Sequence, residues 1–254
     1  MLAAERRDLL LARLRRDGRV VARDLAAELG LSEDSIRRDL RDLAATGACQ
    51  RVYGGAVLAS AALADHRARD GVEPDSKRAV ARVAAGLLRP GCVALLDGGT
   101  TTRAVVRALD PDLACTVVTH SPVLAVDLLE HPRVEVLLLG GRLFRHSAVT
   151  CGAAAVEAAA TIAADVFLLG VTGVHPEHAT TTGDPEEAAM KRALAARAAE
   201  TWVLASREKL GAVSPWTVLP WERVTGVVTD GAPSGTTDRL RARGVTVLGP
   251  ADRA

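Results

Sequence analysis

The chain has 254 residues, of which 48% are hydrophobic and 25% charged, so it is long enough for roughly two soluble domains with buried cores. It has no apolar run of the roughly 18 residues that a membrane helix needs, and its arginine-studded first residues lack the apolar stretch of a signal peptide, so we expect a cytoplasmic protein. The net charge of +1 excludes a strongly basic, histone-like protein but allows sequence-specific DNA binding, because the useful charge can lie on one face.

Residues that commonly bind metals or form disulfides lie scattered along the chain. The four cysteines are far apart and form no CxxC pair, which favours packing over a disulfide or a zinc site. His175 and His178 are the one close histidine pair, and beside Pro176 they predict a polar loop rather than a metal site. We therefore expect neither a metal nor a cofactor.

Two helices are predicted before residue 31. The leucines from Leu9 to Leu14 recur near helical spacing among charged residues, and Gly18 then ends the first helix. Asp24 is placed to cap a second, shorter helix, which Gly30 ends.

A third helix carries the most specific signal of this region. Ser32 is a favourable N-cap. Ile36, Leu40 and Leu43 stand at i, i+4 and i+7 and predict one buried face. Gly47 is the expected stop. A short helix, a tight turn and a capped helix with outward arginines form the layout of a helix-turn-helix. In that layout the second helix of the pair, here the third helix of the region, enters the major groove of DNA. The candidate DNA contacts of this helix are Ser32, Ser35, Arg37, Arg38 and Arg41.

The segment that follows predicts a wing. Two short strands would flank the Gly54-Gly55 turn and place Arg51 and Tyr53 beside the DNA backbone. Residues 1–58 hold eleven arginines against nine acids, so the prediction depends on where the arginines lie rather than on their excess. The alternative is a three-helix unit that only packs or dimerises and whose arginines are solvated.

The segment from Ser32 to Leu40, together with the residues from Arg51 to Ala56, resembles the DNA-binding motif of DeoR-type bacterial transcriptional regulators. Ser35 stands where that family usually has threonine, and Tyr53 stands where histidine is common. The resemblance implies a winged helix-turn-helix that binds a double-stranded DNA operator.

Beyond the wing, the chain divides into a linker and an α/β domain. Residues 59–75 lose periodicity and are polar, which predicts a linker between a DNA-binding domain at 1–58 and a second domain at 76–254. In the second domain, apolar strands alternate with amphipathic helices, which predicts a mostly parallel sheet covered on both faces. Strands are expected at 92–96, 116–119, 134–139, 166–169, 202–205, 226–229 and 245–248. Helices are expected at 76–88, 101–109, 122–130, 153–160, 185–199 and 238–243.

A loop rich in glycine and threonine follows the first of these strands and opens a helix. In the run from Asp97 to Thr102, the glycines let the backbone approach an anion, the helix N-terminus offers free N–H groups, and the threonine hydroxyls add donors. This predicts a phosphate cradle at the strand's carboxyl end, where parallel sheets bind ligands. The alternative is a structural Gly-Gly turn with a threonine cap.

Other polar residues follow neighbouring strands at the same expected sheet edge. A mobile lysine such as Lys209 would complement backbone donors to a phosphate. Only three of the cations are lysines, and this rarity singles out positions 77, 191 and 209. The candidate effector contacts are Asp97, Gly98, Gly99, Thr100, Thr101, His120, Ser121, Arg142 and Lys209.

These segments also resemble the effector domain of DeoR-type regulators, so the resemblance extends over essentially the whole chain. By position, the family's motifs correspond to residues 97–101, 119–121, 187–192 and 206–211. His120 replaces the family's asparagine, and Ser206 replaces its aspartate. The resemblance implies a domain related to the ribose-5-phosphate isomerase and glucosamine-6-phosphate deaminase folds, which senses a phosphorylated sugar or related metabolite.

We therefore expect a ligand-controlled transcriptional regulator, a repressor of a sugar-metabolism operon, and not an enzyme. A homodimer or homotetramer is expected, because one recognition helix seldom gives enough affinity. One alternative is a sugar-phosphate isomerase or deaminase with an appended DNA-binding domain, in which Asp97, Glu187 and Asp230 are the candidate carboxylates. Another is an architectural DNA-binding protein that responds to no metabolite.

Overall fold

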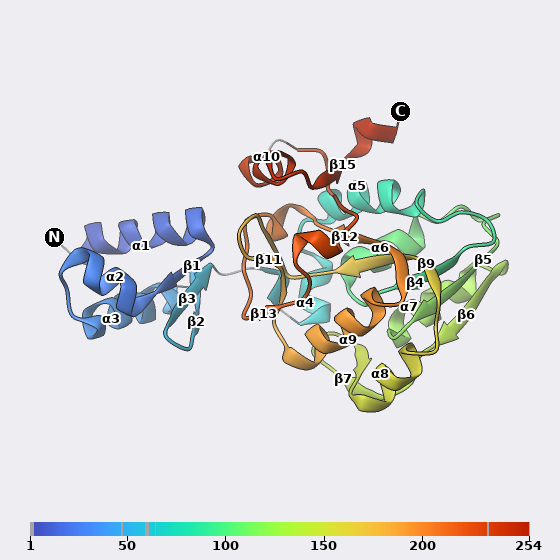
Figure 1. Cartoon of the computed structure of the whole chain (residues 1–254), viewed down its shortest axis with the longest axis horizontal. Helices are drawn as coiled ribbons and strands as arrows, with labels where there is room; N and C mark the ends of the chain where they lie inside the picture. Colours follow the sequence, from blue (N-terminus) through green and yellow to red (C-terminus); the bar gives the residue numbers. More distant parts are fainter. Residues whose placement is uncertain (1–2, 47, 59–60, 64, 233, 254) are drawn as a thin grey trace.

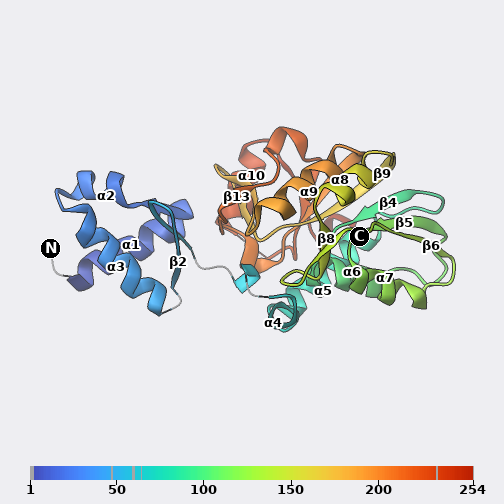
Figure 2. The ribbon, with the colours of Figure 1, turned by 90° about the horizontal axis from the view of Figure 1, so that it is seen from below.

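The computed structural model describes residues 3–46, 48–58, 61–63, 65–232 and 234–253. In these ranges the chain forms a small helical head, residues 3–46 and 48–58, and a larger α/β body (Figures 1 and 2). The segment between them, whose described residues are 61–63 and 65–73, is called the connector. The boundaries that we expect at residues 58 and 75 remain predictions.

The head combines three helices with a small antiparallel sheet. Helices α1 (Ala3–Asp17), α2 (Ala22–Leu29) and α3 (Glu33–Ala45) surround a core that includes the fully buried Leu10 and Ile36. Strands β1 (Arg19–Val21), β3 (Gly55–Leu58) and β2 (Cys49–Val52) lie in that order in the sheet. The sequence pattern does not predict β1, because three residues are too few to show an alternation.

The caps between α2 and α3 are mostly as predicted. Gly30 adopts a φ of 64° and ends α2, and the Ser32 side chain accepts a hydrogen bond from the Ser35 backbone at 3.3 Å. The prediction that Asp24 caps α2 is wrong, since β1 runs directly into that helix and leaves Asp24 in its first turn. Gly47, the expected stop of α3, lies outside the described residues.

The connector contains helical structure that the predicted linker does not anticipate. It holds a 3-10 turn, η1 (Ala61–Leu63), and a short helix, α4 (His66–Asp70), whose N-cap Asp65 accepts from the Ala68 backbone at 2.9 Å. Five residues cannot show a helical period, which is why the sequence reads as irregular. The next helix, α5 (Pro74–Ala85), begins two residues earlier than expected.

The body is built on a sheet of parallel strands, as predicted. Within the described residues the strand order is β15-β14-β12-β9-β4-β5-β6, and every pair is parallel. The strands are β4 (Val93–Leu96), β5 (Cys115–Thr119), β6 (Val134–Leu138), β9 (Ala164–Gly170), β12 (Ala198–Leu204), β14 (Gly226–Val228) and β15 (Thr246–Leu248).

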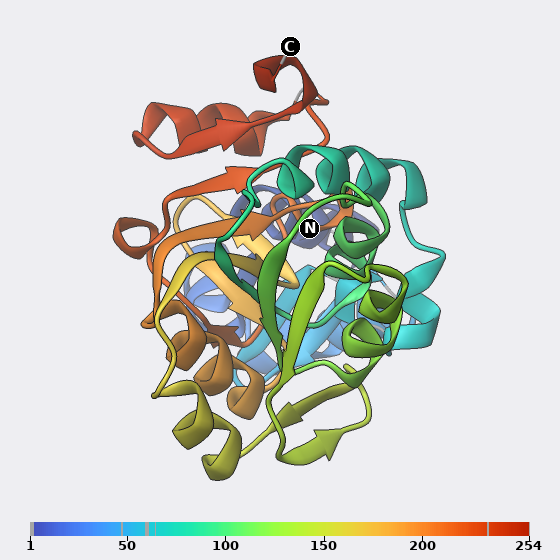
Figure 3. The same ribbon diagram turned by 90° about the vertical axis from the view of Figure 1, so that its right-hand side faces the viewer.

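Helices cover both faces of this sheet (Figure 3). One face is covered by α5, α6 (Thr100–Arg107) and α7 (Pro122–Asp127), which continues into η2 (Leu128–Glu130). The other is covered by α8 (Ala153–Ala159), α9 (Pro185–Ala195) and α10 (Gly235–Ala242). The helix expected at 185–199 is too long, because Ala198 pairs with Ala164 and starts β12. Short 3-10 turns are η3 (Arg207–Lys209), η4 (Trp221–Arg223) and η5 (Pro250–Arg253).

Two small antiparallel units are absent from the prediction. Strands β7 (Arg142–Phe144) and β8 (Val149–Cys151) form a hairpin. Strands β10 (Gly173–His175), β11 (Ala179–Thr182) and β13 (Trp216–Thr217) form a small sheet beside the carboxyl ends of the main strands. Each strand has two to four residues, so its pairing is set by its tertiary neighbours rather than by its own pattern.

Candidate functional site

Helix α3 presents its arginines to solvent. The side chains of Arg37, Arg38 and Arg41 are all exposed. Arg37 also donates from Nε at 3.0 Å and from Nη2 at 2.6 Å to Oε1 of Glu33, one turn earlier. Arg37 lies in the N-terminal half of α3, the half that contacts base edges when such a helix enters the major groove.

The wing lies beside the same part of α3. Arg37 on the helix and Arg51 and Tyr53 on the wing border one hollow of about 140 Å³. The Tyr53 ring is fully exposed. Ser32 and Ser35 meet through their hydroxyls at 2.9 Å, so both order the start of α3. Arg37 of the helix and Arg51 and Tyr53 of the wing thus border one surface hollow.

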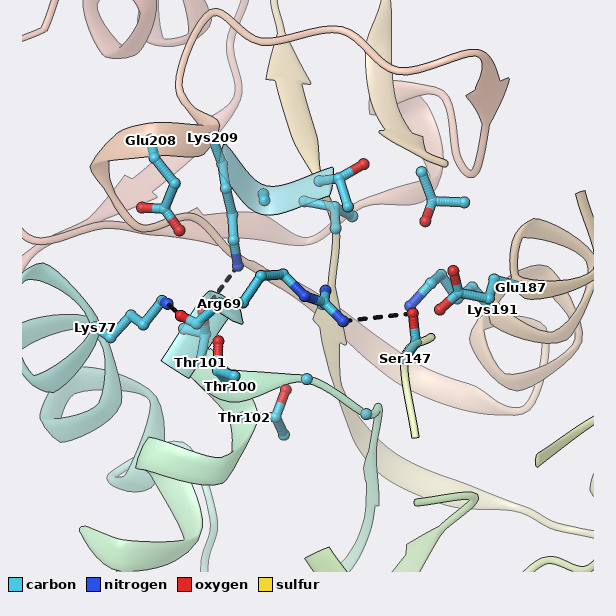
Figure 4. Close-up of a pocket in the computed structure, with 17 residues that line it drawn as sticks. Arg69, Lys77, Thr100, Thr101, Thr102, Ser147, Glu187, Lys191, Glu208 and Lys209 are labelled. Carbon is cyan, nitrogen blue, oxygen red and sulfur yellow. Dashed lines mark hydrogen bonds between the residues drawn. The ribbon is translucent and has the colours of Figure 1, made fainter. Parts of the chain in front are cut away.

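A buried cavity lies at the carboxyl ends of β4, β9 and β12 (Figure 4). This inner cavity has a volume of about 30 Å³ and is lined by the first turn of α6, the residues after β9, and side chains of α5, α9 and η3. An outer cavity of about 280 Å³ adjoins it. The two cavities share the lining residues Ala62, Arg69, Ser147, Thr172 and Glu187.

The predicted cradle loop forms one wall of the inner cavity. Gly98 cannot carry a side chain, because a Cβ there would collide with Val149, and Gly99 adopts a φ of 123°. Thr100, Thr101 and Thr102 follow as the first turn of α6. The Thr102 hydroxyl is buried and has no hydrogen-bond partner among the described residues, which leaves a donor available for a ligand.

The three lysines of the sequence converge on this cavity from three different elements. Lys77 of α5, Lys191 of α9 and Lys209 of η3 all line it, and all three are buried. The Lys209 ammonium donates to Thr101 Oγ1 at 2.8 Å and to the Leu204 carbonyl at 3.2 Å. Burial, which the nearby Glu208 only partly offsets, lowers the pKa of Lys209 to about 8. The cavity therefore brings three ammonium groups together beside a helix N-terminus, where the carboxylates of Glu187 and Glu208 also line it.

Asp97 lies beneath the cavity rather than in its wall. Its fully buried carboxylate accepts from the Lys191 ammonium at 2.5 Å, from His120 Nε2 at 2.8 Å and from the Gly170 backbone at 2.8 Å. Burial alone would raise the pKa of Asp97, but Lys191 and His120 outweigh it and hold the pKa below its ordinary value. Asp97 thus positions Lys191, and the structure does not place it among the residues that line the cavity.

His120 faces two oxygen acceptors. Its Nε2 meets Asp97, and its Nδ1 lies 2.8 Å from the Thr150 carbonyl, so both ring nitrogens donate only in the imidazolium form. Its neighbour Ser121 is buried and donates to the Ala148 carbonyl at 3.2 Å. Both predicted effector contacts therefore support the cavity from below and hold the β7–β8 hairpin.

Arg142 is not brought to the cavity. It begins the unpredicted strand β7, its side chain is exposed, and it forms an ion pair with Glu186 at the surface. The prediction of Arg142 as a cavity residue is therefore wrong. Asp230, a candidate carboxylate for the enzyme alternative, also lies elsewhere, where it accepts from Arg207 at 3.0 Å.

Arg69 is one of the cavity residues that the sequence pattern misses, as are Ser147 and Thr182. It comes from α4, within the stretch that reads as a linker, and its side chain borders both cavities. Lys77 and Lys191 also line the inner cavity, and the rarity of lysine in this chain is the signal that singles them out.

The histidine pair has a packing role. His175 lies buried in β10 rather than in a polar loop, and its ring stacks on that of His178 with centroids 4.8 Å apart. His178 Nε2 contacts the Asp17 carbonyl of the head at 3.1 Å. The described residues contain no group of three potential metal ligands. Nor, in that part of the chain, is any helix both long and apolar enough to cross a membrane.

Comparisons with known proteins cover nearly the whole chain. Residues 6–62 match the DeoR-like helix-turn-helix domain, and residues 72–231 match the DeoR C-terminal sensor domain. The transcriptional regulator GlpR of Haloferax volcanii is 33% identical over 98% of each chain. The transcriptional repressor GlcR of Bacillus subtilis is 30% identical over 98% of this chain and 96% of its own. Ribose 5-phosphate isomerase A from Methanocaldococcus jannaschii superposes with a TM-score of 0.40 at 18% identity over 54% of each chain.

Fold and site together define a two-domain regulator, with a head that binds DNA and a body that binds a small molecule. The chain belongs to the DeoR family of transcriptional regulators. Its relatives over the full length are transcriptional regulators by name, and this chain is likewise a regulator of transcription and not an enzyme.

Proposed function

We propose that this regulator represses an operon of sugar metabolism and that a phosphorylated sugar bound at the inner cavity sets its affinity for DNA. The observation that carries the proposal is the convergence of Lys77, Lys191 and Lys209 on the N-terminal turn of α6. Buried ammonium groups beside a helix N-terminus suit a phosphate dianion, since both the helix dipole and the free N–H groups favour negative charge.

The outer cavity suits the remainder of a sugar. It is bordered by the carboxylates of Asp184 and Glu187 and by the hydroxyls of Ser147 and Thr172. The carboxylates can accept hydrogen bonds from sugar hydroxyls, and the Ser147 and Thr172 hydroxyls can both donate and accept them. The two cavities together therefore suit a phosphorylated compound with several hydroxyl groups.

The DNA contacts are proposed on the surface shared by α3 and the wing. Arg37, Arg38 and Arg41 would lie in the major groove, and Arg51 and Tyr53 would touch the backbone. Because one such head reads only a half-site, we propose a homodimer or homotetramer whose heads occupy two half-sites. The proposed site of action is the cytoplasm.

The test is a mobility-shift titration on the DNA upstream of the protein's own gene. A panel of sugar monophosphates is added, each matched with its unphosphorylated sugar as control. We expect one phosphorylated compound to change the Kd for DNA by roughly 5- to 150-fold, the usual range of allosteric coupling, while its unphosphorylated partner has no effect. An unchanged Kd with every phosphorylated compound would contradict the proposal.

The lowered pKa of Lys209 gives the phosphate affinity a pH dependence. Only the protonated ammonium attracts an anion, so affinity for inorganic phosphate should fall roughly 50-fold between pH 8 and pH 10, because the protonated fraction of a lysine with a pKa of about 8 falls from about one half to about one in a hundred. Phosphate remains chiefly dianionic over this range. Isothermal titration calorimetry at several pH values measures the slope of phosphate affinity against pH.

The matched variant for this measurement is Lys209→Arg. A guanidinium stays charged throughout the range, so the variant's affinity should decline less steeply than that of the wild type. The remaining slope would come from Lys77, whose pKa is also lowered by burial. Equal slopes for the two proteins would show that Lys209 does not contact the anion.

A further inference from the structure

The connector between the head and the body forms part of the effector site. Ala62 of η1 and Arg69 of α4 both line the inner and the outer cavity. In Figure 4 the Arg69 side chain extends between the labelled Lys209 and Ser147, across the space that the other cavity residues surround. A ligand in this site would therefore touch the segment that leads directly to the DNA-binding head.

Contacts on two sides hold this segment on the body. The His66 backbone donates to the His146 carbonyl at 2.8 Å, and His146 Nε2 donates to the Leu63 carbonyl at 3.1 Å. On the other side, the Lys77 ammonium donates to the Arg69 carbonyl at 2.5 Å. The connector is thus anchored at the turn of the β7–β8 hairpin and at a lysine of the cavity itself.

The Arg69 guanidinium is poorly satisfied where it lies. Its Nη2 reaches Ser147 Oγ only at 3.4 Å, and its buried Nε has no hydrogen-bond partner among the described residues. Burial lowers the pKa of Arg69, with Glu187 and Asp97 only partly offsetting that effect. A guanidinium offers five donors in a fork that matches a phosphate, and leaving them unpaired in a buried site is costly. A bound anion would satisfy these donors.

Arg69 also divides the available space. The inner cavity, at about 30 Å³, has room for about one water molecule, whereas the outer cavity has about 280 Å³. Arg69 borders both, so a movement of this side chain would change the space available to a ligand in each of them.

We infer that Arg69 is an effector-binding residue supplied by the connector, and that it clamps the phosphate and repositions α4 when the effector binds. This inference rests on the proposed function. Since α4 continues through η1 to the wing, the position of Arg69 would link the occupancy of the cavity to the placement of the head. The effector thus acts on the connector itself rather than only on the sheet of the body.

The test compares Arg69→Met with Arg67→Met in the full-length protein. Arg67 lies on the same helix but is exposed and lines neither cavity, so its variant removes the same charge from the same element. Titration calorimetry with inorganic phosphate should show a Kd raised about tenfold or more in Arg69→Met and within about twofold of the wild type in Arg67→Met. In hydrogen exchange, phosphate should protect residues 61–63 and 65–70 of the wild type but not those of Arg69→Met.

Each outcome separates the two proposals. Wild-type binding with an unchanged or tighter Kd in Arg69→Met would overturn the inference and leave the phosphate cradle standing. Failure of the wild type to bind phosphate would overturn the proposed function, and the inference with it. If circular dichroism shows that Arg69→Met is unfolded, Arg69→Lys takes its place in the comparison. That variant keeps the charge but loses the two-pronged contact, so a Kd equal to that of the wild type would equally overturn the inference.

Discussion

Replacing both Arg37 and Arg38 with alanine should weaken operator binding by about 100-fold or more while leaving the fold intact. A side chain that reads a base edge contributes roughly 1–3 kcal/mol, so losing two such contacts costs several kcal/mol of binding free energy. Both side chains are exposed, and the surface ion pair of Arg37 with Glu33 adds at most about 0.5 kcal/mol to stability. A mobility-shift titration and a thermal melt measure the two effects.

The matched control is the double variant Arg223→Ala, Arg243→Ala. Both of these arginines are exposed on the body, so the control removes the same charge far from α3. It should bind the operator as the wild type does. If the variant at residues 37 and 38 also binds like the wild type, α3 is not the recognition helix. Titrations at several salt concentrations separate base contacts from phosphate contacts, because the loss of a phosphate contact lowers the salt dependence of binding and the loss of a base contact does not.

Replacing Lys191 with methionine should destabilise the body by about 3–5 kcal/mol, the usual cost of removing one partner from a buried ion pair. The Asp97 carboxylate has no exposed surface, so the loss of Lys191 leaves a charge that solvent cannot reach. For a domain of this size, the effect corresponds to a fall in Tm of roughly 6–20 °C. Differential scanning calorimetry of the full-length protein measures it.

Two further variants identify the cause of that loss. Arg142→Met breaks the exposed pair with Glu186 and should cost less than about 1 kcal/mol, because solvent screens surface ion pairs. Adding Asp97→Asn to Lys191→Met should restore part of the stability, since it removes the unpaired charge. A Lys191→Met protein as stable as Arg142→Met would show that the buried pair does not hold the cavity floor.

The elements that the sequence predicts well are those with strong local signals. In the head, the capping hydroxyl of Ser32 and the spacing of Ile36, Leu40 and Leu43 define α3 without reference to any distant residue. In the body, apolar strands between amphipathic helices predict the parallel sheet, and the Gly98-Gly99 turn predicts the start of α6. Helix period, caps and glycine conformation are properties of a few neighbouring residues, so they can be read directly.

The short antiparallel strands are different. Strand β7 displaces Arg142 to the surface, and no pattern in its three residues foretells this, because such a strand exists only where a partner edge is available. The same holds for α4, whose five residues read as linker and yet bring Arg69 into the cavity.

The sequence by itself therefore determined a DNA-binding head, a parallel α/β body and a glycine-threonine loop suited to an anion. Only the tertiary structure decided which charges meet at that loop. Lys77, Lys191 and Lys209 come from three separate elements, and Asp97, which is predicted as a contact, instead lies beneath the cavity and pairs with Lys191, 94 residues away. Such pairings are fixed by how the chain packs, since a buried charge must find its partner in space rather than in sequence.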